Sequence, residues 1–155
     1  TGRGTKRPSR WKAEDFRVKK DAEIQIVGRR RYEDGQEDKT EQTFQGRFYR
    51  REGRFYLHYR EPAEGGQTSV TLWAEPGRAC VLRGGPFPSR LTFCPGQVLP
   101  ASYQTPFGAL SLEIAAQSLK LGLTDQGGEL EICYDLLSGG KPVSQNRLTV
   151  WARPL

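Results

Sequence analysis

Residues 103–114, YQTPFGALSLEI, contain the clearest structural signal in the sequence. Pro106 presets φ for the first central position of a turn, and Gly108 tolerates the positive φ that often ends one. After the turn, Leu110, Leu112 and Ile114 alternate with small or polar residues at the two-residue period of a half-buried strand. A further strand is expected to end near Tyr103, so these residues predict a β-hairpin.

The same plan of strand and tight turn recurs along most of the chain. Further strands are expected over residues 24–28, 41–50, 55–60, 70–74, 78–83, 91–93, 97–103, 119–124, 129–135 and 143–151, with a corner at 115–118 and a loop at 61–66. Turn signals every roughly 8–12 residues, about ten to eleven strands and no long amphipathic helix are typical of an antiparallel barrel or sandwich. Closure into a barrel would also remove exposed sheet edges.

In these strands every second residue tends to be bulky and apolar, and we expect these side chains to point into the barrel. A barrel of roughly eight strands has an interior that is either filled by side chains or holds one small ligand, and the sequence leaves both alternatives open. The expected inward set comprises Phe44, Phe48, Phe55, Leu57, Leu72, Leu112, Leu121 and Ile132.

Charge is concentrated at the beginning of the chain. The net charge is +6 over 155 residues, and residues 1–20 hold eight of the 24 basic and two of the 18 acidic residues. The remaining residues are therefore neutral overall. We predict a basic, disordered tail over residues 1–20 and a single barrel domain over residues 21–155. A neutral barrel does not support a field over the whole domain that would steer nucleic acid.

The cysteines and the hydropathy of the sequence indicate the cellular compartment in which the protein is expected. Cys80, Cys94 and Cys133 are widely spaced and odd in number, which fits neither a metal knuckle nor a disulfide framework. No apolar run approaches the ~20 residues that span a bilayer, and no early hydrophobic segment resembles a secretory signal. We therefore expect reduced thiols in a cytoplasmic protein with no membrane span.

Several motifs together resemble those of the YwiB-like family of small bacterial proteins. They are G-x-F-Y-x-x-x-G-x-F-Y-L-x-Y (46–59), S-R-L-x-F (89–93), Y-Q-T-P-F-G-x-L-x-L-x-I (103–114), L-x-I-x-Y-D-L (130–136) and V-S-Q-N-R-L (143–148). The resemblance spans residues 22–150 and implies an all-β fold, a single antiparallel calycin-like (lipocalin-type) β-barrel. It carries over no catalytic residue, because none is established for the family.

Four residues are the candidate ligand-binding set: Tyr103, Thr105, Asn146 and Arg147. In the functional interpretation, Tyr103 and Asn146 line the mouth of the barrel and hydrogen-bond a ligand. In the structural alternative, Thr105 belongs to the chemistry of a Thr-Pro-x-Gly turn, and Asn146 satisfies buried backbone groups near the closing strand.

Arginines and tyrosines also interleave on neighbouring strands. On a sheet surface they would form a platform on which tyrosines stack on bases and arginines contact phosphates. The alternative is an outer barrel face whose arginine stems cover the tyrosines and pair with Glu41, Glu52 and Glu61. The candidate nucleic-acid-binding residues are Arg47, Tyr49, Arg54, Tyr56 and Arg60.

The single histidine, His58, is expected on the surface or the rim of the barrel. One histidine excludes the usual His-rich metal centres and a Ser-His-Asp triad beyond chance, so we expect no metal, no cofactor and no catalytic residue. The sequence predicts a non-enzymatic barrel that binds a small apolar ligand in or at its mouth. The alternative is an interaction module that binds RNA or an acidic partner through the tail and the Arg/Tyr face. The oligomeric state stays open.

Overall fold

The computed structural model describes residues 20–63 and 65–155, which form ten strands and no helix. All of the expected tail except Lys20 lies outside the described residues. The strands are β1 (Lys20–Tyr32), β2 (Glu37–Arg51), β3 (Arg54–Ala63), β4 (Gly66–Glu75), β5 (Arg78–Arg83), β6 (Ser89–Phe93), β7 (Val98–Thr105), β8 (Gly108–Thr124), β9 (Gly127–Ser138) and β10 (Lys141–Pro154).

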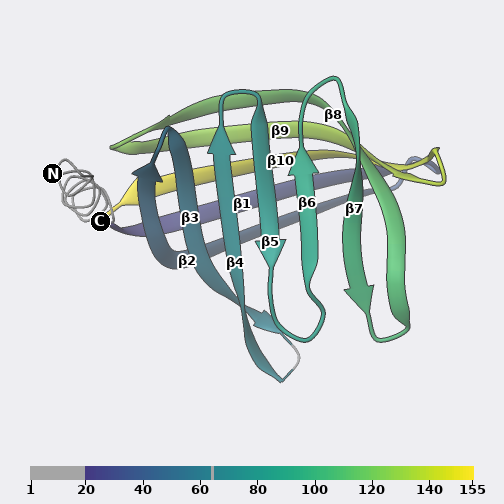
Figure 1. The fold of residues 1–155 in the computed structure, drawn as a ribbon, viewed down its shortest axis with the longest axis horizontal. Coiled ribbons are helices and arrows are strands. Elements are labelled where there is room, and N and C mark those ends of the chain that lie inside the picture. Colours follow the sequence, from purple (N-terminus) through teal and green to yellow (C-terminus); the bar gives the residue numbers. More distant parts are fainter. Residues whose placement is uncertain (1–19, 64) are drawn as a thin grey trace, which may run out of the picture.

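Every strand pairs antiparallel with the next one in sequence, and pairing of β1 with β10 closes the ring. That last ladder runs from Ala22 opposite Pro154 to Tyr32 opposite Ser144. In Figure 1 the long strands β8, β9, β10, β1 and β2 run across the molecule, and β3 to β7 cross them steeply. The predicted all-β, closed antiparallel barrel is thus confirmed.

Three details of the prediction were wrong, each because pairing around the ring extends strands through polar residues. β1 does not stop near Gly28 but continues to Tyr32, with both its edges paired. The corner expected at residues 115–118 is a one-residue bulge, where the pairing of β8 with β9 jumps from Ala116 to Ser118. The loop expected at residues 61–66 is shorter, since β3 reaches Ala63 and β4 begins at Gly66.

The expected inward set does form the core. Phe48, Leu57, Leu72 and Ile132 are each at most 1% exposed, and Phe44, Phe55, Leu112 and Leu121 are partly buried against them. We call the half of the interior around Ala22, Phe48, Leu130 and Ala152 the packed end.

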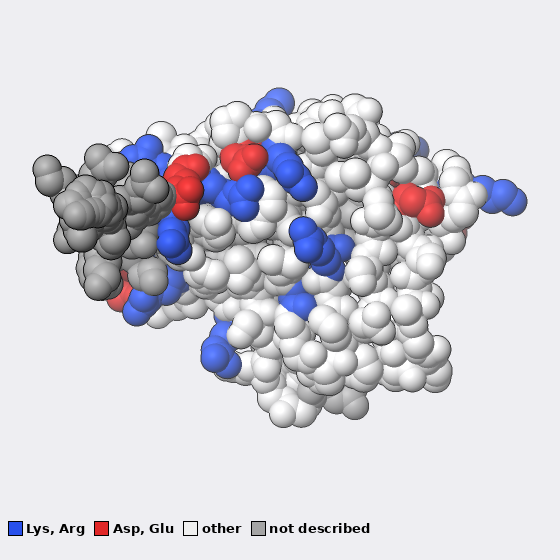
Figure 2. Space-filling model, viewed as in Figure 1, with Lys and Arg blue, Asp and Glu red and all other residues white. Residues whose placement is uncertain are grey.

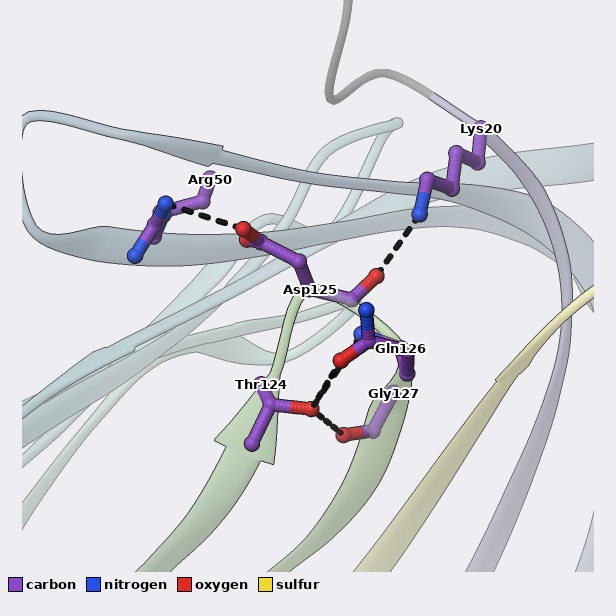
Figure 3. Close-up of polar contacts among 6 residues, drawn as sticks. All are labelled: Lys20, Arg50, Thr124, Asp125, Gln126 and Gly127. Carbon is purple, nitrogen blue, oxygen red and sulfur yellow. Dashed lines mark hydrogen bonds and ion pairs between the residues drawn. The ribbon is translucent and has the colours of Figure 1, made fainter.

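The β8–β9 turn covers the packed end (Figure 3). Lys20 Nζ donates to the Asp125 carbonyl at 2.8 Å, and Arg50 pairs with the Asp125 carboxylate at 2.9 Å. Within the turn, Thr124 Oγ1 donates to the Gly127 carbonyl at 3.2 Å. The turn therefore ties the start of β1 and the end of β2 to the β8–β9 hairpin.

Candidate functional site

A cavity of about 260 Å³ lies at the opposite end of the barrel, which we call the open end. Its floor is apolar and is formed by Ile26, Val81, Leu91, Phe93 and Leu148. Its rim is polar and includes Arg30, Thr40, Gln42, Arg83, Tyr103, Tyr134 and Asn146. The inward-facing residues thus change from apolar to polar toward the open end.

Exposure along β1 and β2 shows that this end is open to solvent. Ile24 and Phe48, at the packed end, are 0% and 1% exposed. Thr40 and Gln42 have the same inward parity as Phe48 on β2, yet both are exposed. A small molecule therefore has a route from solvent to the apolar floor.

Arg30 and Asn146 form a bonded pair at the rim. Arg30 Nε donates to Asn146 Oδ1 at 3.0 Å, and Asn146 Nδ2 donates to Ser144 Oγ at 3.0 Å and to the Ser144 carbonyl at 3.3 Å. Asn146 thus also donates a hydrogen bond to a backbone carbonyl, as the structural alternative expected. A hydrogen bond with Tyr32 and the proximity of Tyr134 raise the pKa of Arg30, so it stays charged.

Arg83 enters the cavity from β5. Burial lowers the pKa of Arg83, but the Glu61 carboxylate, which accepts a hydrogen bond from Arg83 Nε at 2.7 Å, holds that pKa above its ordinary value. Arg83 is therefore a charged group of the cavity whose charge is balanced by Glu61.

Two half-buried tyrosines, Tyr103 and Tyr134, line the cavity together with both arginines. Burial raises the pKa of Tyr134 to about 12 and also raises that of Tyr103, while the charges of Arg30 and Arg83 lower both pKa values to a smaller extent. Both phenols are consequently protonated at neutral pH and are available as hydrogen-bond donors. Two guanidinium groups and two phenols thus converge inside one cavity.

The structure brings two of the four predicted ligand-binding residues together. Tyr103 and Asn146 both line the cavity. Thr105 lies in the exposed β7–β8 turn, where its hydroxyl donates to the Gly108 carbonyl at 2.7 Å and accepts from the Phe107 N–H at 3.1 Å. Arg147 borders the cavity, but its side chain is on the outer face, where a hydrogen bond with Cys133 raises its pKa. The binding role of all four stays a prediction.

Sequence reasoning missed Arg30, Arg83 and Tyr134. Their positions in the strands could have revealed the two arginines. Arg30 lies on the same side of β1 as Ile24 and Ile26, and Arg83 lies on the same side of β5 as Ala79 and Val81. A charged residue on the inward parity of a barrel strand is unexpected in a filled core. Such a residue would have pointed to a polar end of the barrel.

The tyrosines of the predicted nucleic-acid platform stack on one another. Tyr49 and Tyr56 are opposite each other on β2 and β3, with ring centroids 5.0 Å apart and planes at 9°. His58 stacks on Tyr49 at 5.4 Å, and its Nε2 lies 2.8 Å from the Tyr49 hydroxyl. These contacts occupy ring faces that a base would need.

The arginines of that platform contact neighbouring groups. Arg54 bonds Glu75 at 2.8 Å and lies 3.7 Å from the centre of the Trp73 ring, whereas Arg47 pairs with Asp21 at 3.4 Å. In Figure 2 basic side chains are scattered over the face, several of them beside acidic ones. Arg54 and Arg47 thus pair with Glu75 and Asp21 and not with the expected Glu41, Glu52 and Glu61. A nucleic-acid role for Arg60 and the others stays a prediction.

Three further observations concern metal, membrane and thiol chemistry. Within residues 20–63 and 65–155, no cluster of three or more His, Cys, Asp or Glu side chains is arranged to hold a metal ion. The described part of the chain has no helix that is long and apolar enough to cross a bilayer. All three cysteines are free thiols; Cys80 is buried, and Cys94 and Cys133 are half-buried.

Comparisons with known proteins agree with this architecture. Residues 24–150 match the model of a family described as a domain of unknown function, DUF1934. The chain is 25% identical over 118 residues to the uncharacterized beta-barrel protein YwiB of Bacillus subtilis (strain 168), which covers 76% of this chain and 83% of that protein. The crystal structure of the ywiB protein from Bacillus subtilis superimposes with a TM-score of 0.80 at 22% identity, covering 89% of this chain and 94% of that one.

Proposed function

This chain belongs to the DUF1934 family of β-barrel proteins of unknown function, and from that premise we propose that it binds a small, largely apolar ligand in the open end of the barrel without acting as an enzyme. One observation carries the proposal: a solvent-accessible cavity with an apolar floor lies above an otherwise filled core. Its volume of about 260 Å³ is just below the roughly 300–1,000 Å³ typical of pockets for drug-sized ligands. A compact ligand therefore fits.

The groups around the cavity favour binding over catalysis. Burial keeps the pKa of Tyr134 at about 12, and the bond to Glu61 keeps the Arg83 guanidinium charged. Neither group exchanges protons near neutral pH, as an efficient general acid or base does. We place the protein in the cytoplasm, where its free thiols suit a reducing compartment.

A tryptophan scan of one strand tests the proposal. Thr40→Trp would place an indole near Gly28, where a Cβ added to the glycine would lie 3.0 Å from Thr40 Oγ1, and would fill the mouth of the cavity. Thr43→Trp makes the same change on the outer face of β2 and is the matched control. We expect native mass spectrometry after incubation with a lipid extract to show a bound small molecule on the wild type and on Thr43→Trp, and none on Thr40→Trp. Recovery of only the unliganded wild type would contradict the proposal.

The alternative proposal, an interaction module for RNA or an acidic partner, rests mainly on the basic tail. It predicts association that weakens steeply with salt and disappears when residues 1–20 are deleted. Equal affinity at low and high salt would rule it out. We place it second because the Arg/Tyr face is occupied by its own stacking and ion pairs.

A further inference from the structure

We propose that the ligand of the open end is an amphipathic carboxylic acid, with its carboxylate held by Arg30 and the phenols of Tyr103 and Tyr134 and its short hydrocarbon chain on the apolar floor. This inference rests on the proposed function and names the class of ligand. It follows from the placement of charge within the cavity, from the donors around it and from the chemistry of the floor.

Arg30 and Arg83 reach the cavity from separate walls. They stand on β1 and β5, which at least three strands separate around the ring. Each guanidinium nevertheless acts electrostatically on the same two phenols, Tyr103 and Tyr134. Because Glu61 balances the charge of Arg83, the uncompensated positive charge beside the two phenols is that of Arg30, and a bound anion would balance it.

Two carboxylates near the mouth have hydrogen-bond partners of their own, and one of them, Asp38, also lines the cavity. Glu61 bonds Arg83 at 2.7 Å, and Asp38 accepts a hydrogen bond from the Tyr32 hydroxyl at 3.0 Å. Asp38 is opposite Arg30 in the β1–β2 register, yet no carboxylate of the described residues lies within ion-pair distance of Arg30. The observed partner of its Nε–H is the neutral amide oxygen of Asn146. Arg30 is therefore a cation of inward parity at the mouth whose charge an incoming anion would balance.

The geometry of these donors suits a carboxylate. A guanidinium offers a planar fork of N–H groups that matches two carboxylate oxygens, and the phenols of Tyr103 and Tyr134, which line the same cavity, supply O–H donors. Below the rim, Ile26, Leu91 and Phe93 exclude charge. The head group would thus sit at the rim, with the chain pointing toward the packed end.

Octanoate and octan-1-ol distinguish this inference from the proposed function, since they share a chain length and differ in the charged head. We expect isothermal titration calorimetry at pH 7.5 to show octanoate binding at least about tenfold more tightly than octan-1-ol. Arg30→Gln should bring octanoate down to the level of the alcohol. Arg31→Gln, which removes the same charge from an adjacent, exposed residue of outward parity that does not line the cavity, should leave affinity within about twofold.

A second variant covers the case in which Arg30→Gln unfolds, which thermal melting would reveal. Tyr134→Phe keeps the ring and removes one donor, and we expect octanoate affinity to fall about threefold to tenfold while octan-1-ol affinity is unchanged. Equal affinity for the acid and the alcohol in wild-type protein would overturn the inference and leave the proposed function standing. Binding of neither probe would overturn both.

Discussion

The packed end and the open end of the barrel share strands and differ in what those strands present inward. Ile24 on β1 and Phe48 on β2 are fully buried at the packed end, while Arg30 and Thr40 on the same strands reach solvent at the open end. Strand periodicity is the same along both halves. The alternation of residues along a strand thus sets which side chains face the barrel interior. The size and polarity of those side chains set whether that part of the interior excludes solvent.

Pairing between β2 and β3 adds a second difference. β2 pairs with β1 from Glu37 to Phe48, but with β3 only from Gly46 to Arg51. Hydrogen-bond ladders hold adjacent strands about 4.8 Å apart, so the wall widens where the ladder stops. The open end is therefore open for a backbone reason as well as a side-chain reason.

The comparison is tested most strongly by truncating a core side chain. Phe48→Ala removes a ring that is 1% exposed at the packed end, and we expect the free energy of unfolding to fall by about 3–5 kcal/mol because a cavity replaces packed contacts. Urea denaturation measures the loss. Phe107→Ala, at a position 98% exposed in the β7–β8 turn, is the control and should change stability by less than about 0.5 kcal/mol. Similar losses for both variants would refute the assignment of the core.

Alanine substitutions at two glycines measure how closely the backbone is packed at the packed end and nearer the open end. A Cβ on Gly46 would overlap the His58 carbonyl oxygen, which is backbone and cannot rotate away. We expect Gly46→Ala to lower the free energy of unfolding by about 3 kcal/mol. A Cβ on Gly28, nearer the open end, meets only the Thr40 hydroxyl at 3.0 Å, so Gly28→Ala should cost less than about 1 kcal/mol. Thermal melting of both variants checks the order, and a reversed order would show that the open end is the tighter one.

The free energy of unfolding should depend on pH in the alkaline range, because tyrosine side chains ionise there. Burial raises the pKa of Tyr59 and Tyr134 from 10.0 to about 12. The folded state then holds these protons more tightly than the unfolded state, so the stabilisation is complete below pH 10 and is lost as pH rises from about 10 to 12. Each tyrosine would contribute roughly 2–3 kcal/mol to this loss.

Urea denaturation at intervals from pH 9 to pH 12 measures this dependence. Tyr134→Phe should flatten the curve over that range, since the variant has one fewer phenol to ionise. A wild-type free energy of unfolding that stays constant through pH 12 would show that the phenols are not held in their neutral form.

Much of the fold was predictable because strand signals are local. The alternation of Leu110, Leu112 and Ile114 and the Pro106–Gly108 turn indicated a hairpin, and β7 and β8 form it. The sequence predicts a corner around Gln117, whereas the structure has a bulge there. β8 continues through the bulge because it pairs with β9 on both sides of Gln117, and the local sequence does not show that pairing. Polar residues such as Arg29–Arg31 were read as the end of a strand, although two neighbouring strands supply their backbone partners.

The candidate site was predictable only in part. Tyr103 and Asn146 were expected at the mouth, and both line the cavity. Arg83 was read as the last residue of a short apolar strand, because nothing nearby in sequence marks Glu61 as its partner. Contacts between residues 22 positions apart depend on how far each strand is displaced along its neighbours.

By itself, the sequence determined the class of fold, the inward parity and the residues of the filled core, because a two-residue period and a turn are properties of adjacent residues. The fold of the whole chain places Arg30, Arg83, Tyr103 and Tyr134 in the lining of one cavity above an apolar floor. That placement depends on closure of the ring through β1 and β10 and on where each ladder begins and ends. These are long-range features that no single strand encodes.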